Sequence, residues 1–340
     1  MIHRSKAPLR IGLAGGGTDV SPYSDEYGGA ILNATVSLSA NASIEPVTEN
    51  AIILQTLDRK EEQQFELSAS LPINGTLDLH KGVYNRIRKD FGLPLTGFRL
   101  TSFVDAPAGS GLGTSSTLVV AILGAFVEML KLPLGDYDIA HLAYQIERED
   151  LQLAGGKQDQ YAATFGGVNF MDFYEGDKVI VNPLRIKSHY LHELENNLVL
   201  YFTATSRESA AIIKEQVKNV NNKDEKSIEA MHQLKEQSKM MKEALLKGRL
   251  HEIGKILDFG FEQKRRMAHN ISNNDIENIY NAAKKAGATG GKISGAGGGG
   301  FMIFYCPDNT RYAVIDALSK FGGEIKNYTF TKYGLSTWTI

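Results

Sequence analysis

The segment Pro107-Ala-Gly-Ser-Gly-Leu-Gly-Thr-Ser-Ser116 is the most informative part of this 340-residue chain. An apolar run over residues 97–104 predicts a strand before it, and a run that is apolar almost all round, from about 115 to 131, predicts a helix after it. The three glycines allow backbone N–H groups to converge, and the start of the helix adds partial positive charge. The unit therefore predicts an anion site, for which a capped helix after a flexible loop is the alternative.

The hydroxyls at the end of this loop widen what it can bind. Thr114, Ser115 and Ser116 can cap the helix, contact a phosphate or ligate Mg²⁺. The loop is not a Walker A loop, because no Gly-Lys-Ser/Thr sequence closes it and the glycine spacing differs. We therefore predict a phosphate-binding loop of another kind.

A second glycine cluster, Gly295-Ala-Gly-Gly-Gly-Gly300, formally satisfies the dinucleotide-binding pattern G-x-G-x-x-G. Such a loop should open a helix, yet the apolar run that follows, residues 301–306, predicts a strand. We reject the dinucleotide interpretation for this reason. What remains is a loop that can lie close to another backbone segment or to a nucleotide.

Two further segments carry carboxylates. A predicted strand over residues 9–14 runs into three glycines and ends at Asp19, which could accept hydrogen bonds from sugar hydroxyls; an aspartate in a turn is the alternative. Glu147, near the end of a predicted helix, is followed after a glycine-containing turn by Asp159. Two carboxylates beside a phosphate loop suit one Mg²⁺ ligand and one general base, although surface carboxylates are common.

Periodicity predicts the elements of the first half of the chain. Alternation of apolar and polar residues over 34–45 indicates a half-buried strand, with residues 51–57 as its hairpin partner. A helix is expected over about 136–150, with Asp136 as its N-cap. Further strands are predicted at 167–173 and at 178–181.

The pattern changes after about residue 190. The predicted elements from there on are a strand at 198–203, charged helices to about 269, a helix at 275–286, a strand at 301–306, a helix at 309–321 and a strand at 324–330. This order indicates an α+β half with a split βαβ arrangement. We therefore expect two domains, residues 1–190 and 191–340.

Composition argues against several classes of partner. The formal net charge of −2 and the lack of an aromatic–basic platform give no support for nucleic-acid binding. No run approaches the roughly 20 apolar residues of a membrane span, and residues 1–6 lack the apolar core of a signal peptide. A single cysteine, Cys306, fits a reducing compartment. We expect a cytoplasmic protein without a nucleic-acid or membrane partner.

Together and in this order, the four segments resemble the GHMP kinases, the family of galactokinase, homoserine kinase, mevalonate kinase and phosphomevalonate kinase. The first family motif resembles residues 6–19, the Pro-x-x-x-Gly-Leu-Gly/Ser-Ser-Ser loop resembles 107–116, and the glycine-rich third motif resembles 292–300. The resemblance covers nearly the whole chain. It implies ATP and Mg²⁺ as cofactors. It also implies an N-terminal domain like the second domain of ribosomal protein S5 and a ferredoxin-like C-terminal domain.

The resemblance also implies roles for individual residues. Asp159 would be the catalytic base, and Arg10 would lie beside the acceptor oxygen; Ser115 and Glu147 would ligate Mg²⁺. The residues that would wrap the ATP phosphates are Pro107, Gly109, Ser110, Gly111, Leu112, Gly113, Thr114, Ser115 and Ser116. The residues that would hold the sugar are Gly17, Thr18 and Asp19, and those that would support the phosphate loop are Gly295, Gly297, Gly298 and Gly299.

Within the family, the chain is most similar to D-glycero-D-manno-heptose 7-phosphate kinases, through residues 10–23, 28–30 and 156–161. These enzymes phosphorylate the anomeric C1 hydroxyl, which implies heptose 1,7-bisphosphate as the product, for nucleotide-activated heptose synthesis. Residues 15–19 replace the Gly-Glu-His-Thr-Asp of galactokinases with Gly-Gly-Gly-Thr-Asp, which argues against galactose. A fucokinase or other hexose kinase is one alternative, and a non-catalytic sugar and ATP sensor is another.

An acceptor that already carries a phosphate requires a second basic pocket, because a dianion needs Arg or Lys partners. The candidates in the sequence are Lys81, Arg86, Arg207 and Lys264. Arg207 lies in a hydroxyl-rich turn that enters a helix, which is another potential anion site. The sequence is compatible with either a monomer or a homodimer.

Overall fold

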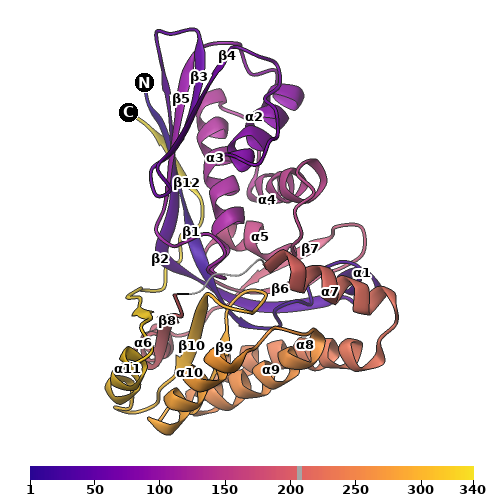
Figure 1. Ribbon diagram of the computed structural model, residues 1–340, viewed down its shortest axis with the longest axis vertical. Helices are drawn as coiled ribbons and strands as arrows, with labels where there is room; N and C mark the ends of the chain where they lie inside the picture. Colours follow the sequence, from indigo (N-terminus) through magenta and orange to yellow (C-terminus); the bar gives the residue numbers. More distant parts are fainter. Residues whose placement is uncertain (205–208) are drawn as a thin grey trace.

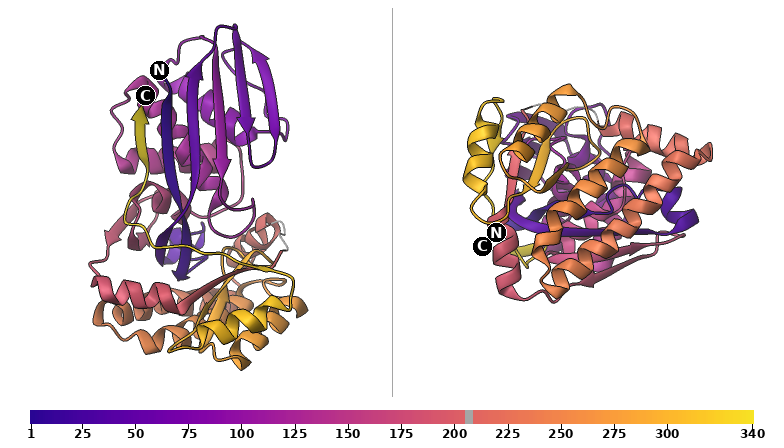
Figure 2. Two further views of the ribbon diagram at one scale, coloured as in Figure 1. Left: turned by 90° about the vertical axis from the view of Figure 1, so that its left-hand side faces the viewer. Right: turned by 90° about the horizontal axis from the view of Figure 1, so that it is seen from below.

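The computed structural model describes residues 1–204 and 209–340, which form two β-sheets with helices packed on them. The molecule is elongated, with the larger sheet and its helices above the smaller sheet and its helices (Figure 1). The two ends of the chain lie side by side at the edge of the larger sheet (Figure 2), where the N–H groups of residues 2 and 340 each donate to the other's carbonyl oxygen.

The larger sheet has the strand order β12-β1-β2-β5-β3-β4, and β6 joins it by pairing with β2 and with β7. Its strands are β1 (His3–Ala14), β2 (Gly29–Pro46), β3 (Ala51–Thr56), β4 (Glu61–Glu66), β5 (Phe98–Val104), β6 (Val168–Phe173), β7 (Val179–Pro183) and β12 (Ser336–Thr339). The long strand β2 lies at the centre of the sheet, where different parts of it pair with β1, β5 and β6.

Helices cover one face of this sheet. They are α1 (Tyr23–Tyr27), α2 (Asp78–Phe91), α3 (Thr114–Leu130), α4 (Asp136–Gln145) and α5 (Gln158–Phe165), with a π-helical turn at Ile146–Asp150. The central helix α3 packs against β1 and β2, and α2, α4 and α5 pack against α3. Every residue of α3 from Leu118 to Phe126 is buried, which explains why its sequence is apolar almost all round.

The smaller sheet has the order β11-β8-β10-β9 and is antiparallel. Its strands are β8 (Leu198–Phe202), β9 (Gly290–Ile293), β10 (Phe301–Tyr305) and β11 (Glu324–Ile325). Its helices are α6 (Ser188–Asn197), α7 (Ser209–Asn221), α8 (Glu225–Lys247), α9 (Ile253–Met267), α10 (Asn274–Lys285) and α11 (Arg311–Ser319), with a 3₁₀ turn at Leu250–Glu252. In chain order the strands lie 4-1-3-2, which is the arrangement of a split βαβ fold and agrees with the expected ferredoxin-like half.

Three expectations about single elements are wrong. Strand β3 is not the hairpin partner of β2, because β5 lies between the two and pairs parallel to β3. Asp136 is not an N-cap: Gly135 takes that position, and its N–H donates to the Asp138 carboxylate at 2.9 Å. The strand expected at 324–330 is reduced to the two-residue β11.

The end of the chain crosses back to the larger sheet. Strand β12 pairs antiparallel with β1, from His3 opposite Thr339 to Lys6 opposite Ser336. The domain range 191–340 expected from the sequence therefore includes a strand that belongs to the first sheet. Among the described residues, no helix is long and apolar enough to cross a membrane.

Candidate active site

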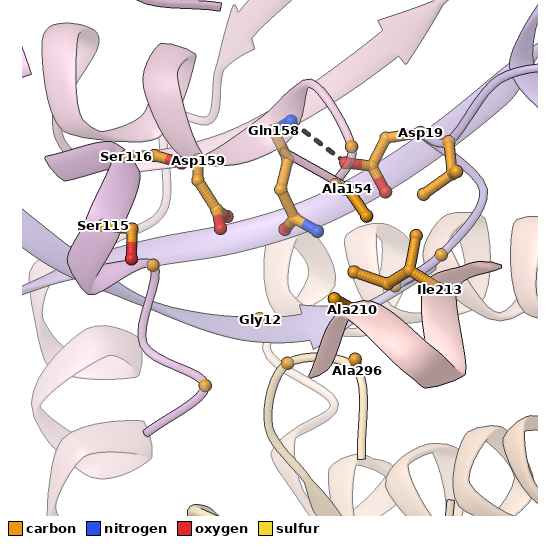
Figure 3. A pocket seen from close by; sticks show the side chains of 18 of the residues that line it. Gly12, Asp19, Ser115, Ser116, Ala154, Gln158, Asp159, Ala210, Ile213 and Ala296 are labelled. Carbon is orange, nitrogen blue, oxygen red and sulfur yellow. Dashed lines mark hydrogen bonds between the residues drawn. The ribbon is translucent and has the colours of Figure 1, made fainter. Parts of the chain in front are cut away.

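A cavity of about 300 Å³ lies where the two halves of the molecule meet. Figure 3 shows Ser115, Asp159 and Asp19 in turn along one side of it. Ile213 of α7 and Ala296 of the β9–β10 loop lie opposite. Because both halves of the chain supply the lining, neither half alone forms this site.

The predicted phosphate-binding loop, residues 107–116 and called the phosphate loop below, packs closely against the β9–β10 loop. A Cβ on Gly111, which has a φ of 86°, would lie 2.5 Å from the Ser294 carbonyl oxygen. A Cβ on Gly295 would lie 2.6 Å from the Cα of Gly111. The Phe301 N–H also donates to the Ser110 carbonyl oxygen at 2.8 Å. The second glycine cluster thus lies against another backbone segment, which is one of the two possibilities that the sequence left open.

The loop residues predicted to bind ATP divide into two groups. Those that line the cavity are Gly109, Gly111, Gly113, Thr114, Ser115 and Ser116. Pro107 is exposed outside the lining, Leu112 packs in the hydrophobic core, and the buried Ser110 hydroxyl has no hydrogen-bond partner among the described residues. The side chains of the second group shape the loop instead of facing the cavity.

The four glycines predicted to support the loop also differ. Gly295 lines the cavity. Gly297 and Gly298 pack against Ile271: a Cβ on Gly297 would lie 2.9 Å from it, and the Gly298 N–H donates to its carbonyl oxygen at 2.8 Å. Gly299 lies outside the lining and has a φ of 158°. These glycines hold the β9–β10 loop in place.

Arg10 on β1 and Asp159 at the start of α5 form an ion pair in the wall of the cavity. Nε and Nη2 of Arg10 lie 2.7 and 2.6 Å from Oδ1 of Asp159. Nη1 of Arg10 donates to the Gly111 carbonyl oxygen at 2.5 Å. Within the described part of the chain, Oδ2 of Asp159 receives no hydrogen bond. One oxygen of this carboxylate is therefore fixed to the phosphate loop through Arg10, and the other is available to accept a proton.

Asp19 lies further along the same wall and is 2% exposed. Its Oδ2 accepts a hydrogen bond from the Gln158 N–H at 3.0 Å, which Figure 3 marks with a dashed line. Burial raises the pKa of Asp19 above its usual value, and the nearby negative charge of Asp159 acts in the same direction. Gln158 and Asp159, which are neighbours on α5, thus place the carboxylates of Asp19 and Asp159 on the same wall of the cavity, in different environments.

The segment before Asp19 contains two other residues predicted to hold the sugar. Gly17 lines the cavity. Thr18 does not: it is fully buried, and its hydroxyl donates to the Gly15 carbonyl oxygen at 2.8 Å and accepts from the Ala30 N–H at 3.1 Å. Thr18 therefore fixes the shape of the turn, whereas the resemblance implied that it would contact the sugar.

Glu147 lies on the π-helical turn, 1% exposed, beside the start of α3. The Gln160 side-chain amide connects the two elements, because its Nε2 lies 2.5 Å from Oε2 of Glu147 and 3.1 Å from Oγ of Ser116. Oε1 of Glu147 has Arg148 at 3.8 Å, which is too long for a hydrogen bond. Oε1 of this buried carboxylate is therefore without a hydrogen bond among the described residues. Glu147 lines the cavity together with Ser115 and Ser116, and a carboxylate and hydroxyls are the hard oxygen donors that Mg²⁺ prefers.

Two buried lysines line the cavity. Nζ of Lys264 on α9 lies 2.5 Å from the Gly295 carbonyl oxygen, and Nζ of Lys292 on β9 lies 2.8 Å from the Gly12 carbonyl oxygen. Burial lowers the pKa of Lys264 to about 8, with a further contribution from the Arg10 charge. Burial also lowers the pKa of Lys292, as do the charges of Lys264 and Arg10. An anionic ligand beside these groups would favour their charged forms.

The other basic residues predicted for a second phosphate lie elsewhere. Lys81 is buried outside the cavity, with its Nζ 2.5 Å from Oδ1 of Asn74. Arg86 also lies outside and donates to Asp150 at 2.7 Å through both Nε and Nη2. These groups meet partners beside α2, so the structure does not bring them to the site. Arg207 lies outside the described residues.

The lining residues that sequence reasoning did not select include Arg148, Gln158 and Lys292. Each lies directly beside a recognised position: Arg148 follows Glu147, Gln158 precedes Asp159, and Lys292 begins the third glycine-rich motif. A single sequence gives little sign of their direction, because it depends on the π-helical turn and on the docking of β9. The signal available was their position within the motifs.

The first half of the molecule has a glycine-rich loop before α3, and the second half is a split βαβ fold. The cavity that they share contains the ion pair of Arg10 and Asp159. These features are those of a small-molecule kinase of the GHMP type. The sequence matches the GHMP kinases N terminal domain over residues 78–167 and the GHMP kinases C terminal domain over 241–324. The chain belongs to the GHMP kinase family.

The chain is 48% identical to a D-glycero-alpha-D-manno-heptose 7-phosphate kinase from Campylobacter jejuni, over 99% of each chain. A crystal structure of a D-glycero-D-manno-heptose 1-phosphate kinase from Bacteriodes thetaiotaomicron matches with a TM-score of 0.86 and 46% identity, over 99% of each chain. A bifunctional fucokinase/GDP-fucose pyrophosphorylase from Arabidopsis thaliana is 26% identical over 88% of this chain and 29% of the plant protein. The chain is a sugar kinase whose close relatives are heptose phosphate kinases.

Proposed function

We propose that the protein transfers the γ-phosphoryl group of ATP to the anomeric C1 hydroxyl of D-glycero-D-manno-heptose 7-phosphate and produces heptose 1,7-bisphosphate. The observation that carries this proposal is the line from the phosphate loop through Asp159 to Asp19, which matches the order of nucleotide, reacting hydroxyl and sugar. The 48% identity to a heptose 7-phosphate kinase supports the choice of sugar.

The chain's own residues supply most of the chemistry. The acceptor hydroxyl attacks the γ-phosphorus, its proton passes to Oδ2 of Asp159, and ADP leaves with the bridging oxygen. Arg10 holds Asp159 in place and offsets negative charge next to the phosphate loop. An anomeric hydroxyl is more acidic than an ordinary alcohol, so the demand on the base is modest.

Glu147 and Ser115 are the residues that we propose to hold Mg²⁺. When bound, the ion would offset charge on the ATP phosphates and orient them. Asp19 is proposed to accept hydrogen bonds from sugar hydroxyls, and Lys264 to offset the charge of bound phosphate; both line the same cavity.

The substrate is tested by comparing kcat/KM for ATP-dependent ADP release with a panel of acceptors. The panel contains heptose 7-phosphate, heptose 1-phosphate, fucose, galactose and mevalonate. The proposal predicts that heptose 7-phosphate exceeds the free sugars by orders of magnitude. A higher value for heptose 1-phosphate would instead follow the name of the Bacteriodes relative, and a higher value for fucose would favour the fucokinase alternative.

A further inference from the structure

A second cavity, of about 270 Å³, adjoins the first on the side away from the phosphate loop. The two cavities share a wall, whose residues are Asp19, Val20, Arg148, Leu153, Ala154, Gly155 and Ile213. A sugar held by Asp19 would therefore have its reacting end at Asp159 and its far end at the second cavity. The space continues the substrate site beyond the sugar-binding carboxylate.

Two consecutive glycines place the side chains at the junction between the cavities. A Cβ on Gly155 would lie 2.3 Å from Nη2 of Arg148, and a Cβ on Gly156 would lie 1.9 Å from Oδ2 of Asp19. Neither glycine has a left-handed φ, so backbone conformation does not require them. Their lack of a side chain instead allows Arg148 and Asp19 to lie against the backbone of this turn.

Of the charged residues that line the second cavity, three are cations and one, Asp19, is a carboxylate; among the cations Arg148 is largely buried and has no carboxylate within hydrogen-bond distance. Lys157 also lines it, but its Nζ pairs with Asp25 at 3.2 Å and with Asp177 at 2.9 Å. Lys214 of α7 lines it as well and is exposed. Arg148 is largely buried, with 13% of its side chain exposed.

The guanidinium of Arg148 makes only long contacts among the described residues. Its donors lie 3.3 Å from the Leu153 and Gly156 carbonyl oxygens, 3.5 Å from that of Ala154 and 3.8 Å from the Glu147 carboxylate. A buried guanidinium without a short charged partner can gain substantially from a phosphate, which it binds through two parallel hydrogen bonds.

We propose that the second cavity binds the phosphate that the acceptor already carries, and that Arg148 is the residue that selects a phosphorylated acceptor over a free sugar. The inference rests on the proposed function and assigns the distal end of that substrate. Gly155 is the positioning residue that seats the Arg148 guanidinium.

The first test replaces Arg148 with Met and measures kcat and KM for heptose 7-phosphate and for unphosphorylated heptose. We expect KM for heptose 7-phosphate to rise about 10- to 100-fold, the scale of a charge-assisted hydrogen bond. KM for free heptose, KM for ATP and the Mg²⁺ dependence should change little. Arg148→Lys should recover part of the loss, and Arg185→Met, at an exposed arginine outside both cavities, is the matched control.

The second test displaces the guanidinium without removing its charge. Gly155→Ala puts a methyl group where Arg148 lies, and the flexible end of that side chain can move aside, so the protein should still fold. We expect the same selective rise in KM for heptose 7-phosphate. Gly135→Ala, whose Cβ would make an ordinary 3.5 Å contact with Oδ2 of Asp138, is the control.

The outcomes separate the two proposals. If the unmodified protein turns over no heptose 7-phosphate, the proposed function fails. If the unmodified protein prefers heptose 7-phosphate to free heptose and both Arg148→Met and Gly155→Ala keep that preference, the subsite at Arg148 is overturned while the kinase function stands. If the unmodified protein uses both sugars equally well, a phosphate subsite is likewise overturned.

Discussion

At the scale of single residues, the site depends on Arg10, which binds one carboxylate oxygen of Asp159 and leaves the other without a hydrogen bond among the described residues. Arg10 holds Oδ1 through two nitrogens and holds the phosphate loop through the third. We propose that Oδ2 accepts the proton of the acceptor hydroxyl. An amide at position 159 would keep the shape of the site but could not take up the acceptor's proton.

We predict that Asp159→Asn lowers kcat by about 10² or more, the scale of general-base catalysis. ATP affinity should change much less, because the phosphate loop is untouched. Single-turnover phosphoryl transfer and nucleotide titration measure the two quantities. Asp172→Asn, on β6 and outside the cavity lining, should behave like the unmodified protein. Near-normal turnover of Asp159→Asn would show that Asp159 is not the base.

A second residue-scale prediction concerns pH. The pKa of Lys264 is lowered from 10.5 to about 8, so the side chain is charged below pH 8 and becomes neutral above it. Binding of phosphate groups in the first cavity, which Lys264 lines, should therefore weaken as the pH rises through about 8, and kcat/KM, which reports the free enzyme, should fall. Lys264→Met should lower kcat/KM below pH 8 and remove the fall. A profile for this variant that keeps the same break would assign it to another group.

At this scale the sequence selected Arg10 and Asp159, which the structure brings together, but not all of the residues around them. The motifs located Arg10, Asp159 and Asp19, and Lys264 was selected for its charge; all four line the cavity. Lys81 and Arg86 were selected for charge alone, and each has a nearer partner beside α2. Charge in a sequence says little about location, because the direction of a long side chain is set by tertiary packing.

At the scale of elements, the start of α5 and the turn before it position the residues that we propose bind the acceptor. The Gln158 N–H at the first residue of α5 holds Asp19, and Asp159 follows it directly. The glycine turn leaves room for Asp19 against the backbone. The close approach makes the turn sensitive to one methyl group.

We predict that Gly156→Ala raises KM for the acceptor about 10-fold or more, on the scale of a hydrogen bond to a charged group. The reason is that the new Cβ would lie 1.9 Å from Oδ2 of Asp19 and would displace the carboxylate. KM for ATP should change little. Steady-state kinetics with each substrate varied in turn checks this, with Gly135→Ala as the control. An unchanged acceptor KM would remove Asp19 from the sugar site.

The local pattern of apolar and polar residues predicted the position of most helices and strands, but it predicted less well which strands pair. The helix expected from about 115 to 131 is α3, Thr114–Leu130, because its apolar run and the following Pro133 are local signals. The pairing of β2 with β3 was wrong because β5, far along the chain, takes the place between them. Strand pairing is a non-local property that alternation within one segment cannot specify.

At the scale of the whole molecule, the chain closes on itself at the edge of the larger sheet. β12 pairs with β1, and the Thr337 and Thr339 hydroxyls lie 3.0 and 2.7 Å from the Glu128 carboxylate at the end of α3. This return strand was not predicted, because four residues give too short an alternation to recognise. It lies at the edge of the sheet far from the cavity.

We predict that deletion of residues 336–340 lowers the free energy of unfolding by about 2–4 kcal/mol, since several hydrogen bonds of about 1 kcal/mol each are lost. Activity at moderate temperature should be retained, because none of these residues lines the cavity. Thermal denaturation and ADP release measure the two effects. Loss of activity at temperatures where the shortened protein is fully folded would contradict this separation of stability from catalysis.

Both halves of the molecule build the cavity in which we propose that a nucleotide meets a sugar phosphate. Phosphorus NMR of the purified protein with ATP, Mg²⁺ and heptose 7-phosphate tests this proposal. We expect a new phosphate signal coupled to the anomeric proton, with the original C7 phosphate retained and one ADP formed per product. A new phosphate on another carbon, or no sugar product while ATP stays intact, would contradict it.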